Sequence, residues 1–133
     1  MSKIDNAKRV LIVEDNMMLS QLYKTKLLLS GFNASIAENG EIALSTVEKF
    51  NPDIILLDIM MPVMTGDEFL EKLRKKEKFA DVPVIILTNM NNGAIAEKFE
   101  PLNISGFLIK SELTPSQVVD YARDILKSHK KRR

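Results

Sequence analysis

The chain has 133 residues, of which 45% are hydrophobic and 28% charged, and it contains one histidine and no cysteine. This length and composition indicate one globular domain and exclude a disulfide scaffold, a cysteine nucleophile and a metal site built from thiolates or several histidines. The formal net charge is +1, but five of the last seven residues are Lys or Arg, and without this stretch 14 basic groups stand against 18 acidic ones.

The sequence has no apolar run near the roughly 20 residues of a membrane-spanning helix, and its polar start lacks the apolar region of a secretory signal. We therefore expect a cytoplasmic protein. The predicted organisation is an N-terminal tail over residues 1–8, one domain over 9–127 and a basic C-terminal tail over 128–133. We interpret the basic tail as a solvated terminus, with contact to nucleic acid or a membrane surface as the alternative.

Short aliphatic runs alternate with amphipathic stretches along the chain. Four runs are typical of parallel strands buried on both faces, over residues 10–13, 54–57, 84–87 and 107–109. The segment 34–37 is more mixed, which predicts an edge strand. This alternation is the (βα)₅ pattern of a doubly wound, five-stranded parallel sheet in an α/β protein.

Five helices are predicted between and after these strands. The first covers residues 16–30 and should bury Leu19, Leu22, Tyr23 and Leu27 on one face. The others are expected over 40–50, from 65–66 onward, over 92–102 and from 114 onward. Gly93 and Pro101 weaken the fourth helix, whereas Thr114-Pro115-Ser116-Gln117 gives the fifth an N-cap, a proline at its first position and a capping box.

Polar side chains follow four of the five predicted strands. Glu14 and Asp15 follow the first, and Asp58, Thr88 and Lys110 follow the third, fourth and fifth. The carboxyl ends of parallel strands share one edge of the sheet, where ligands bind in doubly wound folds. With the strand order 2-1-3-4-5 these four strands are contiguous, and the strand without such a residue is outermost. We therefore expect the five side chains to lie together.

This set of side chains favours the chemistry of a divalent cation and a phosphoryl group. Carboxylates packed closely repel one another unless a cation lies among them, and oxygen ligands without His or Cys favour Mg²⁺, or Mn²⁺, over zinc. The hydroxyl of Thr88 and the charge of Lys110 suit a tetrahedral oxyanion. Asp58, between a metal and a lysine, is a candidate phosphoryl acceptor that would form an acyl phosphate.

Taken together, these motifs resemble the receiver domain of bacterial two-component response regulators, of the single-domain chemotaxis kind. The resemblance covers residues 9–126 and implies the flavodoxin-like receiver fold. It rests on an acidic pair, a phosphoacceptor loop with Asp, Met-Pro and Gly at the family spacing, a switch hydroxyl, a switch aromatic and a lysine: Glu14-Asp15, residues 58–66, Thr88, Phe107 and Lys110.

The resemblance implies that a histidine kinase or phosphotransfer protein phosphorylates Asp58 in a Mg²⁺-dependent reaction. Asp15, Asp58 and the carbonyl of Met60 would hold the metal, with Glu14 acting mainly through water. Thr88 and Lys110 would hold phosphoryl oxygens.

The resemblance also implies a switch. Movement of Thr88 and Phe107 would change the surface formed by the helix over 92–102, the strand over 107–109 and the helix from 114 onward. This surface would control an output protein or form a homodimer. The chain would then be a signalling module that catalyses its own phosphorylation and dephosphorylation rather than an enzyme. No nucleic-acid or membrane partner is expected. No output domain follows the receiver, so we expect a separate output protein or a chain cut from a longer one.

Three positions depart from the family pattern, and one of them is Met60, an apolar residue at a position that tunes dephosphorylation in the family. Ser111 follows Lys110 where the family usually has Pro, and Asn89 follows Thr88 where Ala or Gly is common. A cis bond before a non-proline residue costs about 2.5–4 kcal/mol, so the sequence leaves the conformation of the Lys110–Ser111 peptide open between cis and trans. We expect Asn89 to narrow access to the phosphoryl group. These departures leave open an alternative function, a receiver-like docking scaffold that works without phosphorylation.

Overall fold

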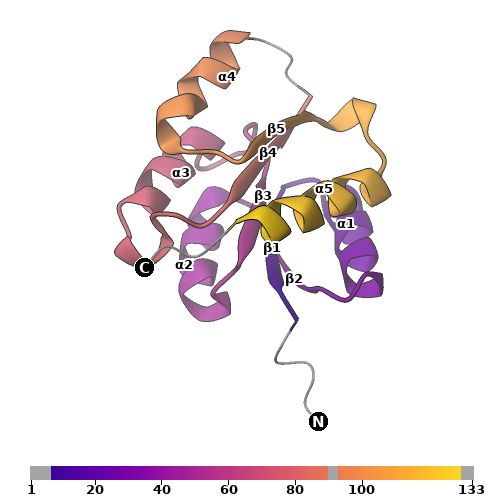
Figure 1. The fold of residues 1–133 in the computed structure, drawn as a ribbon. Coiled ribbons are helices and arrows are strands. Elements are labelled where there is room, and N and C mark those ends of the chain that lie inside the picture. The colour runs from indigo at the N-terminus through magenta and orange to yellow at the C-terminus, as the bar shows by residue number, and fades with distance from the viewer. Residues whose placement is uncertain (1–6, 90–92, 130–133) are drawn as a thin grey trace.

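The computed structural model describes residues 7–89 and 93–129. Its five parallel strands form one sheet in the order β2-β1-β3-β4-β5, which confirms the predicted topology (Figure 1). The strands are β1 (Arg9–Val13), β2 (Asn33–Ala37), β3 (Ile54–Leu57), β4 (Val84–Thr88) and β5 (Gly106–Ile109). The helices are α1 (Met17–Leu29), α2 (Gly40–Phe50), α3 (Gly66–Arg74), α4 (Gly93–Phe99) and α5 (Pro115–Ser128).

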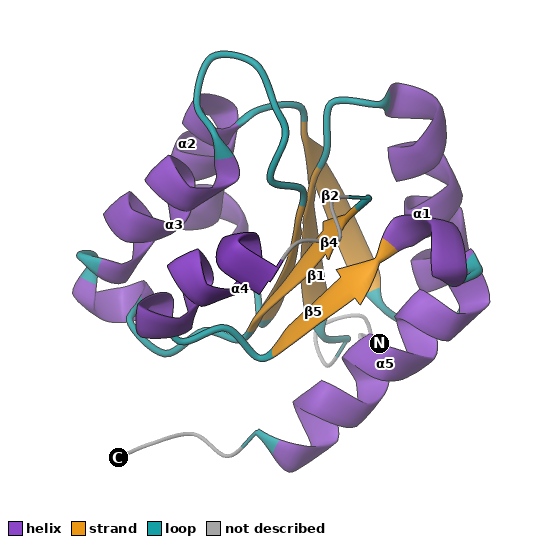
Figure 2. Ribbon diagram, turned by 90° about the horizontal axis from the view of Figure 1, so that it is seen from above, coloured by secondary structure: helices purple, strands orange, loops and turns teal. Residues whose placement is uncertain are grey.

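Helices cover both faces of the sheet, as the strict alternation of strands and helices requires. Figure 2 shows α1 and α5 on one face and α2, α3 and α4 on the other. Two apolar clusters fill the space between these layers, and residues of one strand alternate between them: Leu11 and Val13 face α2 and α3, whereas Val10 and Ile12 face α1 and α5. The sheet is therefore buried on both sides at its centre.

The strand register brings the polar strand ends to one level. Val13 of β1 pairs with Leu57 of β3, so Glu14 and Asp58 leave the sheet side by side. Thr88 of β4 pairs with Ile109 of β5, so Lys110 follows one residue after this last pair. The edge of the sheet where ligands bind in this fold class therefore carries the predicted side chains.

Local sequence signals account for most helix boundaries. The second helix occupies residues 40–50 as predicted, and the side chain of Asn39 accepts the backbone N–H of Ile42 at its N-terminus at 2.8 Å. At α5 the predicted capping box is present: the Thr114 hydroxyl accepts the Gln117 N–H at 3.2 Å, and the Gln117 side chain accepts the Thr114 N–H at 2.9 Å.

Two predictions about burial are wrong. Leu22 is 53% exposed, and the buried face of α1 consists of Ser20, Tyr23 and Leu27. These residues are three and four positions apart, so Leu22 lies about 100° away around the helix. The run over residues 107–109 is half-buried rather than covered on both faces, because β5, like β2, is an edge strand.

The fourth helix is shorter than predicted. It ends at Phe99, and Pro101 lies in a separate 3₁₀ turn, η3 (Glu100–Leu102). Its predicted start at residue 92 lies outside the described residues, as do residues 1–6 of the N-terminal tail and 130–133 of the basic tail. Across the described ranges, every helix is too short or too polar to cross a membrane.

Candidate functional site

Three carboxylates gather at the carboxyl ends of β1 and β3. One oxygen from each of Glu14, Asp15 and Asp58 lies within 4.8 Å of the others. Glu14 and Asp58 are 2% and 5% exposed, whereas Asp15 is exposed at the rim. Backbone hydrogen bonds continue past the ends of the strands and hold Glu14 and Asp58 in place. The Asp58 N–H donates to the Val13 carbonyl and the Glu14 N–H to the Ala37 carbonyl, each at 3.0 Å.

Lys110 reaches this cluster from the end of β5. Its Nζ lies 2.7 Å from Oε1 of Glu14 and 3.4 Å from Oδ2 of Asp58. The second oxygen of Glu14, Oε2, accepts the backbone N–H of Asn16 at 3.1 Å. Both oxygens of Glu14 therefore have close protein partners, whereas the contacts of Asp58 are looser.

Burial dominates the electrostatics of Asp58. Its removal from water and the charge of Glu14 raise its pKa from 3.8 to about 6, against the opposing effect of Lys110. Burial alone would lower the pKa of Lys110, but its hydrogen bond to Glu14 and the charge of Asp58 raise it above its ordinary value. The lysine is therefore an ammonium ion at neutral pH.

The loop after β3 folds back tightly over Asp58. The Met60 N–H donates to Oδ1 of Asp58 at 3.3 Å, while the Met60 residue as a whole is 60% exposed. Gly66, the first residue of α3, lies so close that a Cβ there would stand 2.8 Å from the Ile59 Cα and 2.9 Å from the Asp58 carbonyl oxygen. Only glycine permits this approach without movement of the backbone.

The same loop contains a strained turn. Val63 has a φ of 71°, and the N–H of Met64 donates to the carbonyl of Pro62 at 2.7 Å, which closes a three-residue γ-turn. A β-branched residue with positive φ is an outlier, and such strain often occurs at functional loops. Val63 is 72% exposed, so burial of its side chain does not explain why a valine occupies this strained position.

The two predicted switch residues lie on β4 and β5, the strands that follow β3 in the sheet. Thr88, at the end of β4, is 1% exposed. Phe107 of β5 is half-buried and packs against the apolar cluster under α2, α3 and α4, which includes Phe99 of α4. The side chain of Phe107 therefore packs on the face of the sheet that α2, α3 and α4 cover.

Asn89 and Ser111, which both depart from the family pattern, contact each other. Oδ1 of Asn89 accepts the backbone N–H of Ser111 at 2.9 Å. The Lys110–Ser111 peptide, whose conformation the sequence left open, is trans, like every peptide bond among the described residues. Nothing in the separate sequence positions, 22 residues apart, indicates this bond.

Sequence reasoning placed Tyr23 in the core but not beside the site. This tyrosine of α1 is 2% exposed, and burial raises its pKa, which the charges of Lys110, Glu14 and Asp58 also influence. Its phenol is therefore close enough to the charged cluster to be influenced by it. A cavity of about 400 Å³ lies elsewhere, among residues such as Asp53, Phe79 and His129.

The residues present fit a divalent cation. Three carboxylates face one ammonium group, so negative charge is in excess, and carboxylate and carbonyl oxygens are the ligands that Mg²⁺ prefers. Burial raises the pKa of Asp58, and groups with perturbed pKa values beside a specific charged partner, here Lys110, cluster at functional sites.

Comparisons with known proteins agree with this geometry. Residues 10–123 match the family described as the response regulator receiver domain. A probable transcriptional regulator, ycf29 of Porphyra purpurea, is 35% identical over 119 residues, which are 88% of this chain and 56% of that protein. A sensor histidine kinase, TmoS of Ectopseudomonas mendocina, is 32% identical over 102 residues, 77% of this chain and 10% of the kinase.

Solved structures share the fold. The chemotaxis protein CheY4 of Vibrio cholerae superposes with a TM-score of 0.84 at 26% identity, over 90% of this chain and 98% of that one. The present chain spans about half the length of ycf29, at 56%. Since the family match covers most of the chain, the protein belongs to the response regulator receiver domains of two-component systems.

Proposed function

We propose that this receiver domain is a switch operated by phosphorylation of Asp58, with a histidine kinase or phosphotransfer protein as the donor. The observation that carries the proposal is the position of Lys110. Its ammonium group lies 3.4 Å from Asp58 while that carboxylate shares a cluster with Glu14 and Asp15. A nucleophile, a cation to bind phosphoryl oxygens and a cluster of metal ligands are thus within one small site.

The transfer makes one bond and breaks one. A carboxylate oxygen of Asp58 attacks the phosphorus of a phosphohistidine, the phosphorus–nitrogen bond breaks, and its electron pair remains on the imidazole. Lys110 and Thr88 hold the oxygens of the transferred group. Because the metal-free pKa of Asp58 is about 6, the side chain is mostly ionised at neutral pH and can act as the nucleophile.

We assign the metal ligands as Asp15, Asp58 and the carbonyl of Met60, with Glu14 acting through water. Glu14 already engages Lys110 at 2.7 Å and the Asn16 N–H at 3.1 Å, which supports its indirect role. Bound Mg²⁺ would neutralise charge on the carboxylates and on the phosphoryl group. The chain itself supplies the nucleophile and the ammonium ion, so we propose that it catalyses its own phosphorylation and dephosphorylation.

The output of the switch is proposed to be the surface of α4, β5 and α5. Thr88 ends the strand before α4, and Phe107 packs against the same apolar cluster as Phe99 of α4. Rearrangement of Thr88 around a phosphoryl group would therefore reach α4 and β5 through packed side chains. A separate protein, or a second copy of the chain, would read this surface.

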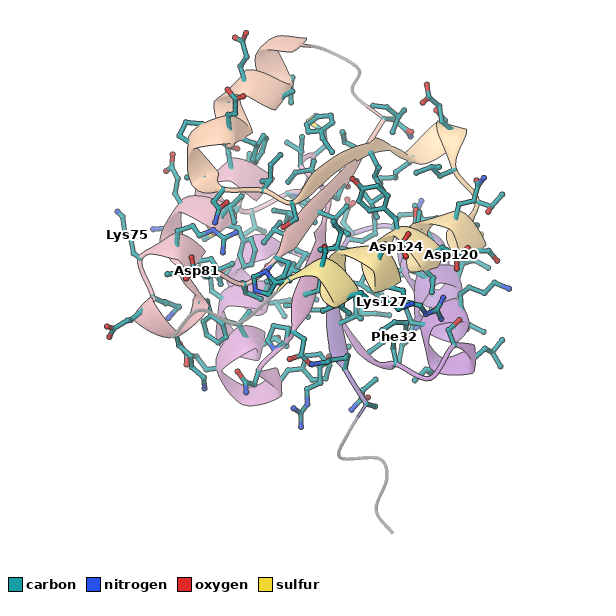
Figure 3. All side chains as sticks on the ribbon, in the orientation of Figure 1. Phe32, Lys75, Asp81, Asp120, Asp124 and Lys127 are labelled. Atoms are coloured by element: carbon teal, nitrogen blue, oxygen red, sulfur yellow. The ribbon has the colours of Figure 1, made fainter. Side chains whose placement is uncertain are left out.

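The test is intact mass after incubation with acetyl phosphate, with and without Mg²⁺, for the wild type and for Asp58→Asn. One added phosphoryl group that requires both Mg²⁺ and Asp58 is expected. Asp124→Asn, at an exposed carboxylate on α5, is the control and should be labelled normally (Figure 3). A wild type that gains no phosphoryl group and binds no Mg²⁺ would refute the proposal in favour of a docking scaffold.

A further inference from the structure

We infer that Asn89 is a positioning residue for Lys110, and that it acts through the backbone N–H of Ser111. This inference rests on the proposed function, since Lys110 matters there as the group that binds the phosphoryl oxygens. Its basis is the hydrogen bond of 2.9 Å from the Ser111 N–H to Oδ1 of Asn89.

The bond lies where the backbone ladder between β4 and β5 ends. The last paired residues are Thr88 and Ile109, so Asn89 and Lys110 are the first residues beyond the ladder on each side. Lys110 begins a 3₁₀ turn, η4 (Lys110–Glu112). The first N–H groups of such a turn have no acceptor within the turn. The side chain of Asn89 supplies one to Ser111.

This contact has a consequence for the lysine because β5 is an edge strand. Among the described residues, its only neighbouring strand is β4. Lys110 must extend from this edge to carboxylates that belong to the central strands β1 and β3, and its long side chain loses rotamer freedom when it is held there. The hydrogen bond from the Ser111 N–H to Asn89 fixes the Lys110–Ser111 peptide relative to the end of β4. The backbone from which the Lys110 side chain extends therefore has less conformational freedom.

The bond also joins the two loops that would hold the phosphoryl oxygens. Asn89 is covalently next to Thr88, and Ser111 is next to Lys110. The distance between the threonine hydroxyl and the ammonium group therefore depends on the bond between Asn89 and Ser111. The backbone of the metal ligands is outside this link, because Glu14, Asp15 and Asp58 follow β1 and β3, although Lys110 contacts Glu14 and Asp58 through its side chain.

The test separates anion binding from metal binding. Asn89→Ala removes the acceptor, Asn89→Asp retains an oxygen at that place, and Ser111→Ala is the matched control because it keeps the backbone N–H. Three quantities are measured by NMR: exchange of the Ser111 amide proton, affinity for Mg²⁺ alone, and affinity for beryllofluoride at saturating Mg²⁺.

Asn89→Ala should speed exchange of the Ser111 amide and weaken beryllofluoride binding by about 2- to 10-fold, the effect of one net hydrogen bond, with no loss of Mg²⁺ affinity. Ser111→Ala should leave all three quantities at wild-type values, and Asn89→Asp should retain the protection of the amide.

Equal beryllofluoride affinity in Asn89→Ala and the wild type would overturn the inference alone. A parallel loss of Mg²⁺ affinity would also overturn it, since that result indicates a general disturbance of the site. A wild type that binds neither Mg²⁺ nor beryllofluoride would refute the proposed function, and the inference with it.

Discussion

Asp58→Asn is expected to stabilise the metal-free protein at neutral pH. The side chain is 5% exposed, and its pKa is raised from 3.8 to about 6, chiefly because burial disfavours the charged form. A difference of this size means that ionised Asp58 destabilises the fold by about 3 kcal/mol. Asparagine has nearly the same shape and no charge, so it removes this penalty and leaves the pair of Lys110 and Glu14 in place.

The effect depends on pH in a defined direction. Between pH 4 and 6, approximately, the folded protein retains a proton on Asp58 that the unfolded chain has lost, so stability falls as the pH rises through this window. Below the unfolded pKa of 3.8 the carboxyl is neutral in both states, and the asparagine variant gains nothing. Above pH 6 the full penalty applies to the wild type.

Urea unfolding in EDTA measures this difference. The free energy of unfolding of Asp58→Asn should exceed that of the wild type by up to about 3 kcal/mol at pH 7.5 and by much less at pH 4.5. Asp124→Asn should match the wild type at both values. A gain that is equal at the two pH values, or a loss at pH 7.5, would refute the reasoning. Mg²⁺ at 100 times its Kd should add about 2.7 kcal/mol to the wild type and so close the gap.

Three further substitutions test the loops and connections around the site. Gly66→Ala should destabilise the protein by about 1–3 kcal/mol and slow phosphorylation, because the new methyl group would meet the backbone of Ile59 and Asp58. Val63→Gly should raise the free energy of unfolding by about 1 kcal/mol, because relief of strain at positive φ outweighs the flexibility that glycine adds to the unfolded chain. Arg74→Lys should cost about 2–3 kcal/mol, since one ammonium group cannot replace the guanidinium bonds to the carbonyls of Phe79, Leu102 and Asn103.

Each of these substitutions has a control and an outcome that contradicts it. Gly40→Ala, whose methyl would meet only the Met64 side chain, should cost less than Gly66→Ala, and an equal loss would argue against a special role for the loop over Asp58. A less stable Val63→Gly would show that the turn is not strained. Arg123→Lys, at a surface ion pair with Asp120, should change the free energy of unfolding by less than about 1 kcal/mol. An equally small change in Arg74→Lys would contradict the importance of the three bonds from Arg74 to backbone carbonyls.

The sequence by itself carries the information that is local along the chain. Aliphatic runs indicate parallel strands, because a strand that is buried on both faces needs apolar side chains throughout. A polar residue follows each of the four runs, and the carboxyl ends of parallel strands share one edge of the sheet. Capping residues mark helix ends for the same reason, since the groups that they satisfy lie within one turn, as at Thr114 and Gln117. The fold class and the grouping of Glu14, Asp58 and Lys110 could therefore be predicted.

Contacts between separate loops were decided by the tertiary structure. Lys110 lies closer to Glu14, 96 residues away in sequence, than to Asp58, and Asn89 bonds to Ser111 across the gap between two strand ends. The outward position of Leu22, the approach of Gly66 to Asp58 and the influence of the charged cluster on Tyr23 have the same origin. Each depends on strand register, helix rotation and loop path, and these are set by the packing of the whole domain rather than by neighbouring residues in the chain.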